Sequence, residues 1–357
     1  MPLLSIDQLL HEAVRRKSSD LHLTTGQPPL LRVDGKLTAM AGDPLTPEDT
    51  QVLAQQLLTP AQISRFEQTF ELDTAYSIKG LSRFRVNCYR QRGSVGVAIR
   101  TIPFEIPSLE ALGMPPTLKE FADRPSGLVI VSGPTGAGKS TTLAAMIDYI
   151  NQRRNCHIVS IEDPIEYLHR HRRATINQRE LGIDTISFHE ALRHVVRQDP
   201  NVILIGEMRD LETMHAALTL AETGHLVFTT LHTGDATHVI NRIVDVFSPH
   251  QQLQIRIQLS LVLVAVVVQQ LLPRATGQGR VVAYEIMHVT PAIAGLIRDN
   301  NLHQIKSTIQ TGRRFGMNTM TQSLAELYRA GLVTWDEIAR RSTDPNELAT
   351  LVQAGQS

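Results

Sequence analysis

Cysteine is scarce in this sequence, which has two, Cys88 and Cys156, among 357 residues. They lie far apart and form no Cys-x-x-Cys pair, so a disulfide scaffold and a four-cysteine zinc site are both excluded. Long hydrophobic runs are missing as well. The longest, Leu261–Val268, has eight residues, whereas a membrane-spanning helix needs about 20. We therefore expect a reduced, cytoplasmic protein with no membrane insertion, in which this run forms a buried helix or strand.

An excess of charge of either sign is also absent, since Lys and Arg together number 35 and so do Asp and Glu. No overall positive field exists to attract nucleic acid, so we expect no nucleic-acid partner, and a DNA-translocating protein is disfavoured. What the sequence does have is a hydrophobic fraction of 42% and enough length for two domains, each with its own core.

The chain is predicted to have three parts. Residues 1–104 favour a small α+β domain, because segments of alternating polarity joined by Gly-containing turns are typical of an antiparallel sheet. Residues 105–126 are rich in proline and indicate a linker of restricted flexibility. In residues 127–357 short β-rich segments alternate with helical patterns, which predicts an α/β fold with a parallel sheet. The expected strands there are 128–132, 157–161, 202–206, 225–231 and 281–286.

The first expected strand of the second domain runs into a glycine-rich turn and then a helix. This turn has the spacing of a phosphate-binding P-loop. Its glycines let successive backbone N–H groups converge on a phosphate, and the start of the helix adds a positive dipole end. Lys139 can reach the β- and γ-phosphates and Ser140 can ligate Mg²⁺, so we expect ATP and Mg²⁺ as cofactors. The nucleotide-binding residues are then Gly133, Pro134, Thr135, Gly136, Ala137, Gly138, Lys139, Ser140 and Thr141.

Acidic residues follow the next two expected strands of this domain. Glu162 and Asp163 follow one of them, with Glu166 shortly after, and Glu207 follows the other. In open α/β sheets ligands bind beyond the carboxyl ends of the strands, so these carboxylates are expected to face the γ-phosphate, hold Mg²⁺ or orient water. The alternatives are that the acids only cap a turn at Pro164, or that a buried strand simply ends at a solvated glutamate.

Two further groups of polar residues stand at places where a ligand could bind. His232 follows the strand 225–231 and could hydrogen bond to a γ-phosphate, although a lone histidine there is more often packed or solvated. In the N-terminal domain Arg83 and Arg85 alternate onto one face of a strand, with Arg100 nearby. The cationic residues of this face are arginines rather than lysines, which favours forked contacts with an anion. A sheet face that is simply solvated would explain the arginines as well.

In their order and spacing these motifs resemble the Walker A, Asp box, Walker B and His box of the type IV pilus retraction ATPases, the PilT family of secretion motor ATPases. The blocks that carry the likeness are Ser19–Leu23, Leu31–Gly35, Arg83–Asn87, Gly133–Thr142, Ile161–Tyr167, Ile205–Asp210, Glu222–Thr233 and Ile309–Gly312 with Gly316 and Met317. The resemblance implies a PAS-like N-terminal domain and a RecA-like P-loop ATPase domain, assembled as a homohexamer that hydrolyses ATP to retract pili. ATP would lie between the two domains.

The same resemblance implies roles for individual residues. Glu166 would be the general base that polarises water, Glu207 would coordinate or position Mg²⁺, and Lys139 would neutralise charge on the phosphates. Two histidines would sense the state of the nucleotide and two N-terminal arginines would contact it; these are His225, His232, Arg85 and Arg100. The implied partner is an inner-membrane pilus platform protein, which would make this chain peripheral at that membrane. A paralogous pilus ATPase is a further candidate partner.

One block departs from the family pattern. The retraction signature Ala-Ile-Arg-Asn-Leu-Ile-Arg-Glu is replaced by the residues Ala292–Asp299, in which Ala294 and Gly295 stand for Arg and Asn. A charge is lost, and glycine weakens a helix by about 1 kcal/mol relative to alanine. This leaves open an accessory pilus ATPase that supports a partner motor. A pilus-assembly or type II secretion ATPase is the other alternative, but those proteins usually carry a four-cysteine zinc insert.

Overall fold

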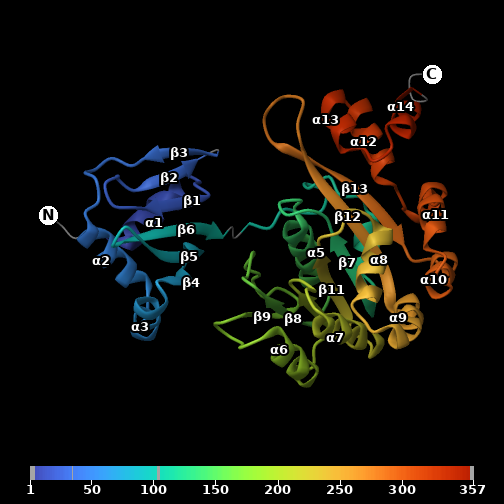
Figure 1. Ribbon diagram of the computed structural model, residues 1–357, viewed down its shortest axis with the longest axis horizontal. Helices are drawn as coiled ribbons and strands as arrows, with labels where there is room; N and C mark the ends of the chain where they lie inside the picture. The colour runs from blue at the N-terminus through green and yellow to red at the C-terminus, as the bar shows by residue number, and fades with distance from the viewer. Residues whose placement is uncertain (1–4, 34, 103–104, 354–357) are drawn as a thin grey trace. The chain divides into compact units, whose positions relative to one another are not determined.

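The computed structural model describes residues 5–33, 35–102 and 105–353 of the chain. They form two units, both drawn in Figure 1. One consists of the residues up to Glu105 with the short segment Glu166–Leu168, and the other of Ile106–Ile165 and the residues from His169 onward. The first has an antiparallel sheet and the second a largely parallel one. The α/β class with a smaller N-terminal α+β domain, predicted from the sequence, is confirmed.

The N-terminal unit is a six-stranded sheet with three helices. The strand order is β3-β2-β1-β6-β5-β4, and every neighbouring pair is antiparallel. The helices α2 and α3 both begin with a threonine capping box followed by proline, which explains their sharp starts. The elements are α1 (Ile6–Arg15), β1 (Asp20–Leu23), β2 (Leu30–Val33), β3 (Lys36–Ala39), α2 (Pro47–Leu57), α3 (Pro60–Thr69), β4 (Glu71–Ile78), β5 (Ser82–Gln91) and β6 (Ser94–Ile102).

The two faces of this sheet differ in chemistry. Alternate residues such as Leu21, Val86 and Ile99 are buried in a core that they share with residues of the three helices. The residues between them belong to the other face, as the period of two in a strand requires. There a row of four charged residues crosses β2, β1, β6 and β5 as successive register partners: Arg32, Asp20, Arg100 and Arg85.

The larger unit has a seven-stranded sheet of order β13-β12-β7-β11-β10-β8-β9. All neighbouring pairs from β12 to β9 are parallel, and β13 is antiparallel to β12. Its strands are β7 (Gly127–Ser132), β8 (His157–Glu162), β9 (Thr175–Glu180), β10 (Val202–Ile205), β11 (Leu226–Leu231), β12 (Leu263–Pro273) and β13 (Arg280–His288). Its helices are α4 (Thr117–Ala122), α5 (Lys139–Arg153), α6 (Phe188–Val195), α7 (Leu211–Glu222), α8 (Ala236–Asp245), α9 (Pro249–Val262), α10 (Pro291–Arg298), α11 (Ile305–Thr311), α12 (Met320–Arg329), α13 (Trp335–Arg341) and α14 (Pro345–Gln353).

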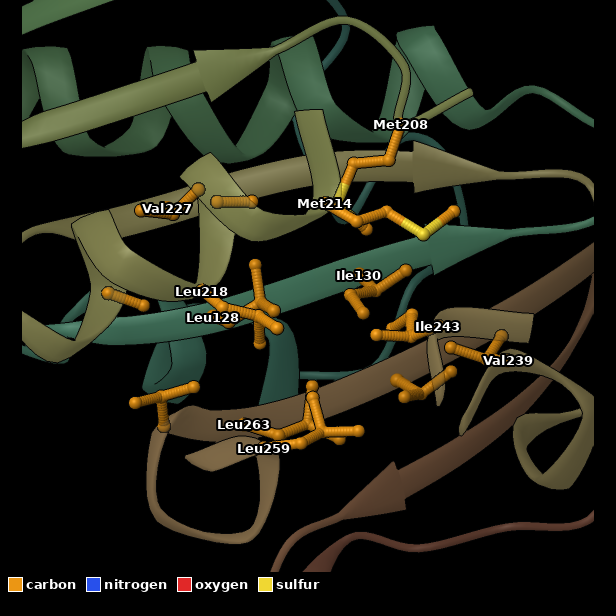
Figure 2. Close-up of a cluster of buried hydrophobic side chains, with 14 of the residues drawn as sticks. Leu128, Ile130, Met208, Met214, Leu218, Val227, Val239, Ile243, Leu259 and Leu263 are labelled. Atoms are coloured by element: carbon orange, nitrogen blue, oxygen red, sulfur yellow. The ribbon is translucent and has the colours of Figure 1, made fainter. Parts of the chain in front are cut away.

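The central strands of this sheet are covered on both faces. β7, β10 and β11 are buried along their whole length, which explains why their apolar residues are consecutive rather than alternating. Two large hydrophobic clusters pack against the sheet. Figure 2 shows part of one of them, in which Leu128 and Ile130 of β7 lie beside Leu218 of α7 and Ile243 of α8. The sheet is therefore a rigid base for the loops that follow its strands.

Three parts of this unit differ from the sequence prediction. The segment 281–286 lies in a strand, β13, but this strand is antiparallel and forms a hairpin with β12. The apolar run Leu261–Val268 is both helix and strand, because α9 ends at Val262 and β12 begins at Leu263. β9 lies at the edge of the sheet, and its polar residues leave no apolar run to reveal it. None of the helices in the described part of the chain has the length and apolar character needed to cross a bilayer.

Most of the proline-rich segment predicted as a linker is part of the larger unit. Five apolar side chains of this segment are buried in one of the clusters of that unit: Leu109, Met114, Leu118, Phe121 and Ala122. The prolines thus lie in a segment whose apolar residues are anchored in the core of the larger unit.

Candidate active site

The strand order brings four sequence motifs together at the carboxyl ends of the parallel strands. The P-loop follows β7, and the segments that carry His232, Glu207 and Asp163 follow β11, β10 and β8, which are the next three strands across the sheet. Hydrogen bonds join the strand ends: Ser132 Oγ donates to the carbonyl oxygen of Thr233 at 2.8 Å, and the N–H of Gly206 donates to that of Ile161 at 2.8 Å.

The P-loop has a backbone conformation that depends on its glycines. Gly133, Gly136 and Gly138 have φ of +138°, +80° and +87°, a region that residues with a Cβ atom rarely adopt. A Cβ atom on Gly133 would also lie 2.3 Å from the carbonyl oxygen of Gln269 on β12. The side-chain amide of Gln269 donates to the carbonyl oxygen of Ala137 at 2.7 Å. β12 therefore holds the loop in shape, a role that sequence reasoning missed.

Lys139, the first residue of α5, is buried with 8% of its surface exposed. Its ammonium donates to the carbonyl oxygens of Gly133 at 2.9 Å and Pro134 at 3.1 Å, within the P-loop itself. Burial lowers the pKa of Lys139, and the nearby carboxylate of Glu207 opposes that shift. The ammonium is thus held at the loop by weak neutral acceptors, which a phosphate oxygen can replace.

His232 connects Lys139 to Glu207. Its Nδ1 lies 3.3 Å from the Lys139 ammonium and its Nε2 lies 3.2 Å from Glu207 Oε1. An ammonium has donors only, so Nδ1 must accept the hydrogen bond from lysine. The ring proton is then assigned to Nε2, which donates to the carboxylate. A neutral imidazole of this single tautomer therefore links the P-loop lysine to the acid that follows β10.

The second oxygen of Glu207 binds an arginine that the sequence reasoning did not single out. Arg209 Nε donates to Glu207 Oε2 at 2.8 Å, and Arg209 Nη1 lies 3.6 Å from Oδ2 of Asp163. One continuous network thus runs through Lys139, His232, Glu207, Arg209 and Asp163. The available signal was the place of Arg209 within the Ile205–Asp210 block, directly after two motif residues.

The residues predicted to hold Mg²⁺ have suitable chemistry. Ser140 lies in the first turn of α5 and is exposed, and the side chain of Glu207 is 24% exposed. Hydroxyl and carboxylate oxygens are the ligands that Mg²⁺ prefers, with phosphate oxygens and water completing its octahedron. The described residues contain no cluster of three or more His, Cys, Asp or Glu side chains that could hold a metal without such help.

Glu162 and Asp163 differ in their surroundings. Glu162 is 7% exposed and its Oε1 accepts hydrogen bonds from Ser160 at 2.6 Å and Gln178 at 3.2 Å. Glu162 is therefore engaged within the sheet, unlike the exposed Asp163, and its predicted place facing the γ-phosphate stays a prediction. Buried Glu180 was missed: its carboxylate accepts from the N–H of Ile165 at 3.2 Å and so fixes the loop after Asp163.

His225 lies far along the sheet from the P-loop of its own chain, and its predicted role in sensing the nucleotide stays a prediction. It precedes β11, and its carbonyl oxygen accepts from the N–H of Gly127, the first residue of β7. The P-loop begins six residues later at Gly133, which is about 20 Å along a strand. The His225 ring binds the carbonyl oxygen of Leu220 at 2.9 Å. His225 thus lies at the opposite end of the sheet from the P-loop of its own chain.

The remaining predicted residues lie in the N-terminal unit. Arg85 and Arg100 are direct register partners on β5 and β6, and Arg100 Nε donates to Asp20 Oδ1 at 2.9 Å. Arg32 lies 3.5 Å from the other oxygen of Asp20. Burial would raise the pKa of Asp20, but the hydrogen bonds from Ser19 and Arg100 bring it below its usual value. Glu166, in the segment grouped with this unit, is exposed; its role, like those of the two arginines, stays a prediction.

Comparison with known proteins agrees with this arrangement. A family model described as type II/IV secretion system protein matches residues 2–340. The type IV pilus retraction ATPase PilT of Pseudomonas aeruginosa is 45% identical over 96% of this chain and 99% of its own. The type IV pilus ATPase PilU of the same organism is 41% identical over 99% of this chain and 92% of its own. A crystal structure of the pilus retraction motor PilT with bound ADP superimposes with a TM-score of 0.92 at 48% identity, covering 97% of this chain and 99% of that one.

Near full-length identity, the shared fold and the complete row of nucleotide-binding motifs lead to one conclusion. The chain is a P-loop ATPase with a RecA-like core, and it belongs to the type II/IV secretion system protein family, within it to the type IV pilus retraction (PilT) ATPases.

Proposed function

We propose that this chain assembles as a homohexameric motor that hydrolyses ATP to retract type IV pili. It would act in the cytoplasm, peripheral at the inner membrane through the pilus platform protein. The network from Lys139 to Glu207 carries the proposal, because it joins the phosphate-binding lysine to the Walker B acid through a side chain able to respond to the nucleotide. The 45% identity to a pilus retraction ATPase over nearly the full length supports the direction of the work.

Catalysis would consist of positioning and charge neutralisation, since phosphoryl transfer needs little covalent help. The P-loop amides and Lys139 would bind the phosphates, and Ser140 and Glu207 would hold Mg²⁺, which neutralises phosphate charge when bound. Lys139 would exchange its carbonyl acceptors for phosphate oxygens. His232 Nδ1 would then lose its donor, which gives the ring a way to report that a γ-phosphate is present.

Four further roles stand as parts of the same proposal. Glu166 would act as the general base that polarises the attacking water. Arg85 and Arg100 would contact the nucleotide, and their pairing across neighbouring strands supports a joint role because two forked cations lie side by side. In this scheme Asp163 would help to orient water, and Thr141 would complete the phosphate-binding turn.

A strain experiment tests the function. Surface pilus number and twitching would be measured in a deletion strain and in strains carrying only Lys139→Ala or Glu166→Gln. Retraction predicts abundant pili without movement in all three. Bald cells would contradict the proposal and indicate an assembly ATPase. Purified Lys139→Ala is expected to lose ATP turnover, and Glu166→Gln to keep ATP bound while hydrolysis slows steeply.

An accessory role remains the second candidate, because PilU is nearly as similar as PilT and because Ala294 and Gly295 alter the retraction signature. In the structure α10 is nonetheless a complete helix with Ile293 and Ile297 buried. An accessory subunit predicts that deletion leaves pili and movement near normal while a paralogous motor is present. Deletion in a strain lacking any such paralogue would separate the two functions.

A further inference from the structure

Arg209 stands between the acids of two motifs that are separated in the sequence. Its Nε donates to Glu207 Oε2 at 2.8 Å and its Nη1 is 3.6 Å from Asp163 Oδ2. The hydrogen bond and the charge of Glu207 raise the pKa of Arg209, and Asp163 adds to the effect. The arginine is thus paired on two sides although its side chain is 61% exposed.

The backbone around Arg209 is fixed on both sides. The buried Met208 donates its N–H to the carbonyl oxygen of Thr230 at 3.2 Å. Asp210 caps α7 by accepting from the N–H of Thr213 at 2.8 Å. The backbone of Arg209 is thus held between two anchors, which fixes the point from which its side chain extends.

The loop after β8, which carries Asp163, lies close to the loop after β10, which carries Arg209. Gly206 donates its N–H to the carbonyl oxygen of Ile161, and a Cβ atom on Gly206 would lie 3.3 Å from Cα of Glu162. The loops after β8 and β10 therefore meet at a glycine, which brings their acids within reach of a single guanidinium. A guanidinium suits this place because its planar fork presents separate N–H groups to two carboxylates.

We propose that Arg209 is a positioning residue that holds the Glu207 and Asp163 carboxylates in one arrangement and, before Mg²⁺ binds, supplies the positive charge beside Glu207. Its role has two sides. It orients the Walker B acid for turnover, and it competes electrostatically with a divalent cation for the same carboxylate. The inference requires that the chain binds and hydrolyses ATP, but not that it retracts pili.

The opposing effects define the test. Purified Arg209→Gln should lower kcat for ATP at least tenfold, because both carboxylates lose their common partner. The Mg²⁺ concentration that half-saturates binding of a fluorescent ADP should fall at least threefold in the same variant, because the competing charge is gone. Damage to the fold would weaken Mg²⁺-dependent binding instead of strengthening it, so the pair of changes is specific.

Two variants complete the experiment. Arg209→Lys keeps the charge but not the fork, so it should keep the wild-type Mg²⁺ requirement while kcat stays low. Arg15→Gln is the matched control, since Arg15 is another exposed arginine in a short pair with a glutamate, at 2.6 Å, and should behave as wild type.

The proposal fails if Arg209→Gln keeps kcat within threefold of wild type, if its Mg²⁺ requirement is unchanged or higher, or if Arg209→Lys restores turnover. Wild-type protein without any ATP turnover would instead contradict the ATPase itself, and the Mg²⁺ dependence of ADP binding would still decide the role of Arg209.

Discussion

Lys139 Nζ, at the start of α5, and His232 Nδ1, directly after β11, lie 3.3 Å apart. Because the lysine can only donate, the contact requires a neutral imidazole with its proton on Nε2, where Glu207 accepts it. The lysine that binds phosphate and the acid that follows β10 are thus joined by one ring, and replacing this ring tests the connection directly.

His232→Phe keeps a ring of similar size without either nitrogen. We expect kcat for ATP to fall at least tenfold, while the affinity for ADP changes less than threefold because the P-loop amides and Lys139 are untouched. Steady-state turnover and binding of a fluorescent ADP measure the two quantities. His250→Phe, at an exposed position on α9, serves as the control. Normal turnover by His232→Phe would remove the ring from the mechanism.

Gln269 supports the P-loop from β12 through its hydrogen bond to the carbonyl oxygen of Ala137. Gln269→Leu has a similar size but cannot donate, so that buried carbonyl loses its partner, at a cost of about 1–3 kcal/mol. We expect lower stability in urea unfolding together with weaker ADP binding, because the loop loses its support. A variant with wild-type ADP affinity would show that the glycine conformation alone shapes the loop.

His169 should make stability sensitive to acid. Burial lowers the pKa of its imidazole to about 4, with a small opposing effect from Asp148, and its Nδ1 is buried without a hydrogen-bond partner among the described residues. The unfolded chain takes up this proton near pH 6.5. The contribution of neutral His169 to the free energy of unfolding is therefore complete above pH 6.5. It is lost as the pH drops toward 4, and the loss is about 2 kcal/mol at pH 5.

The check for His169 is urea unfolding at pH 7.5 and pH 5 for the wild type and for His169→Gln. The difference in free energy of unfolding between the two pH values should be about 2 kcal/mol smaller in the variant, whatever its stability at pH 7.5. The exposed His250→Gln should leave the difference unchanged. An equal acid effect in His169→Gln and wild type would contradict the assignment.

Glu285 joins two helix starts inside the larger unit. The residue is 7% exposed. Its carboxylate accepts hydrogen bonds from the N–H of Ala236, the first residue of α8, at 2.9 Å and from the N–H of Met320, the first residue of α12, at 3.4 Å. Burial raises the pKa of this carboxyl despite those bonds. Glu285→Ala leaves both N–H groups unpaired and should cost about 2–4 kcal/mol in thermal or urea unfolding. Glu285→Gln keeps one acceptor and should cost less; equal losses would argue against the paired caps.

Gly295 lies in the interior of α10, and a Cβ atom there would meet only Arg298 Nη2, at 3.8 Å. Gly295→Ala should therefore stabilise the helix by about 1 kcal/mol and raise the midpoint of thermal unfolding. Ala294→Gly, its neighbour in the same helix, should shift stability the other way. Destabilisation by Gly295→Ala would show that this position needs the flexibility of glycine.

Much of the candidate site is readable without a structure, for a local reason. The P-loop depends on positive φ angles at Gly133, Gly136 and Gly138 and on a helix that starts at Lys139, and both are properties of a few consecutive residues. The strand before the P-loop and the strands before the acidic residues are also visible in the sequence, because each contains an apolar run that is buried on both faces of the sheet. Local patterns of this kind indicate that polar groups stand at strand ends, but not which strands are neighbours.

Tertiary structure decided the rest. The motifs occur along the chain in the order β7, β8, β10, β11, yet the sheet places them as β7, β11, β10, β8, which puts His232 next to Lys139 and separates Asp163 from it by two strands. The same pairing sends His225 to the far end of the sheet and lets Arg209 and Gln269 reach groups remote in sequence. Such contacts depend on which strands are neighbours in the sheet. The strand order is set by the burial of whole sheet faces, so no short segment of the sequence reveals it.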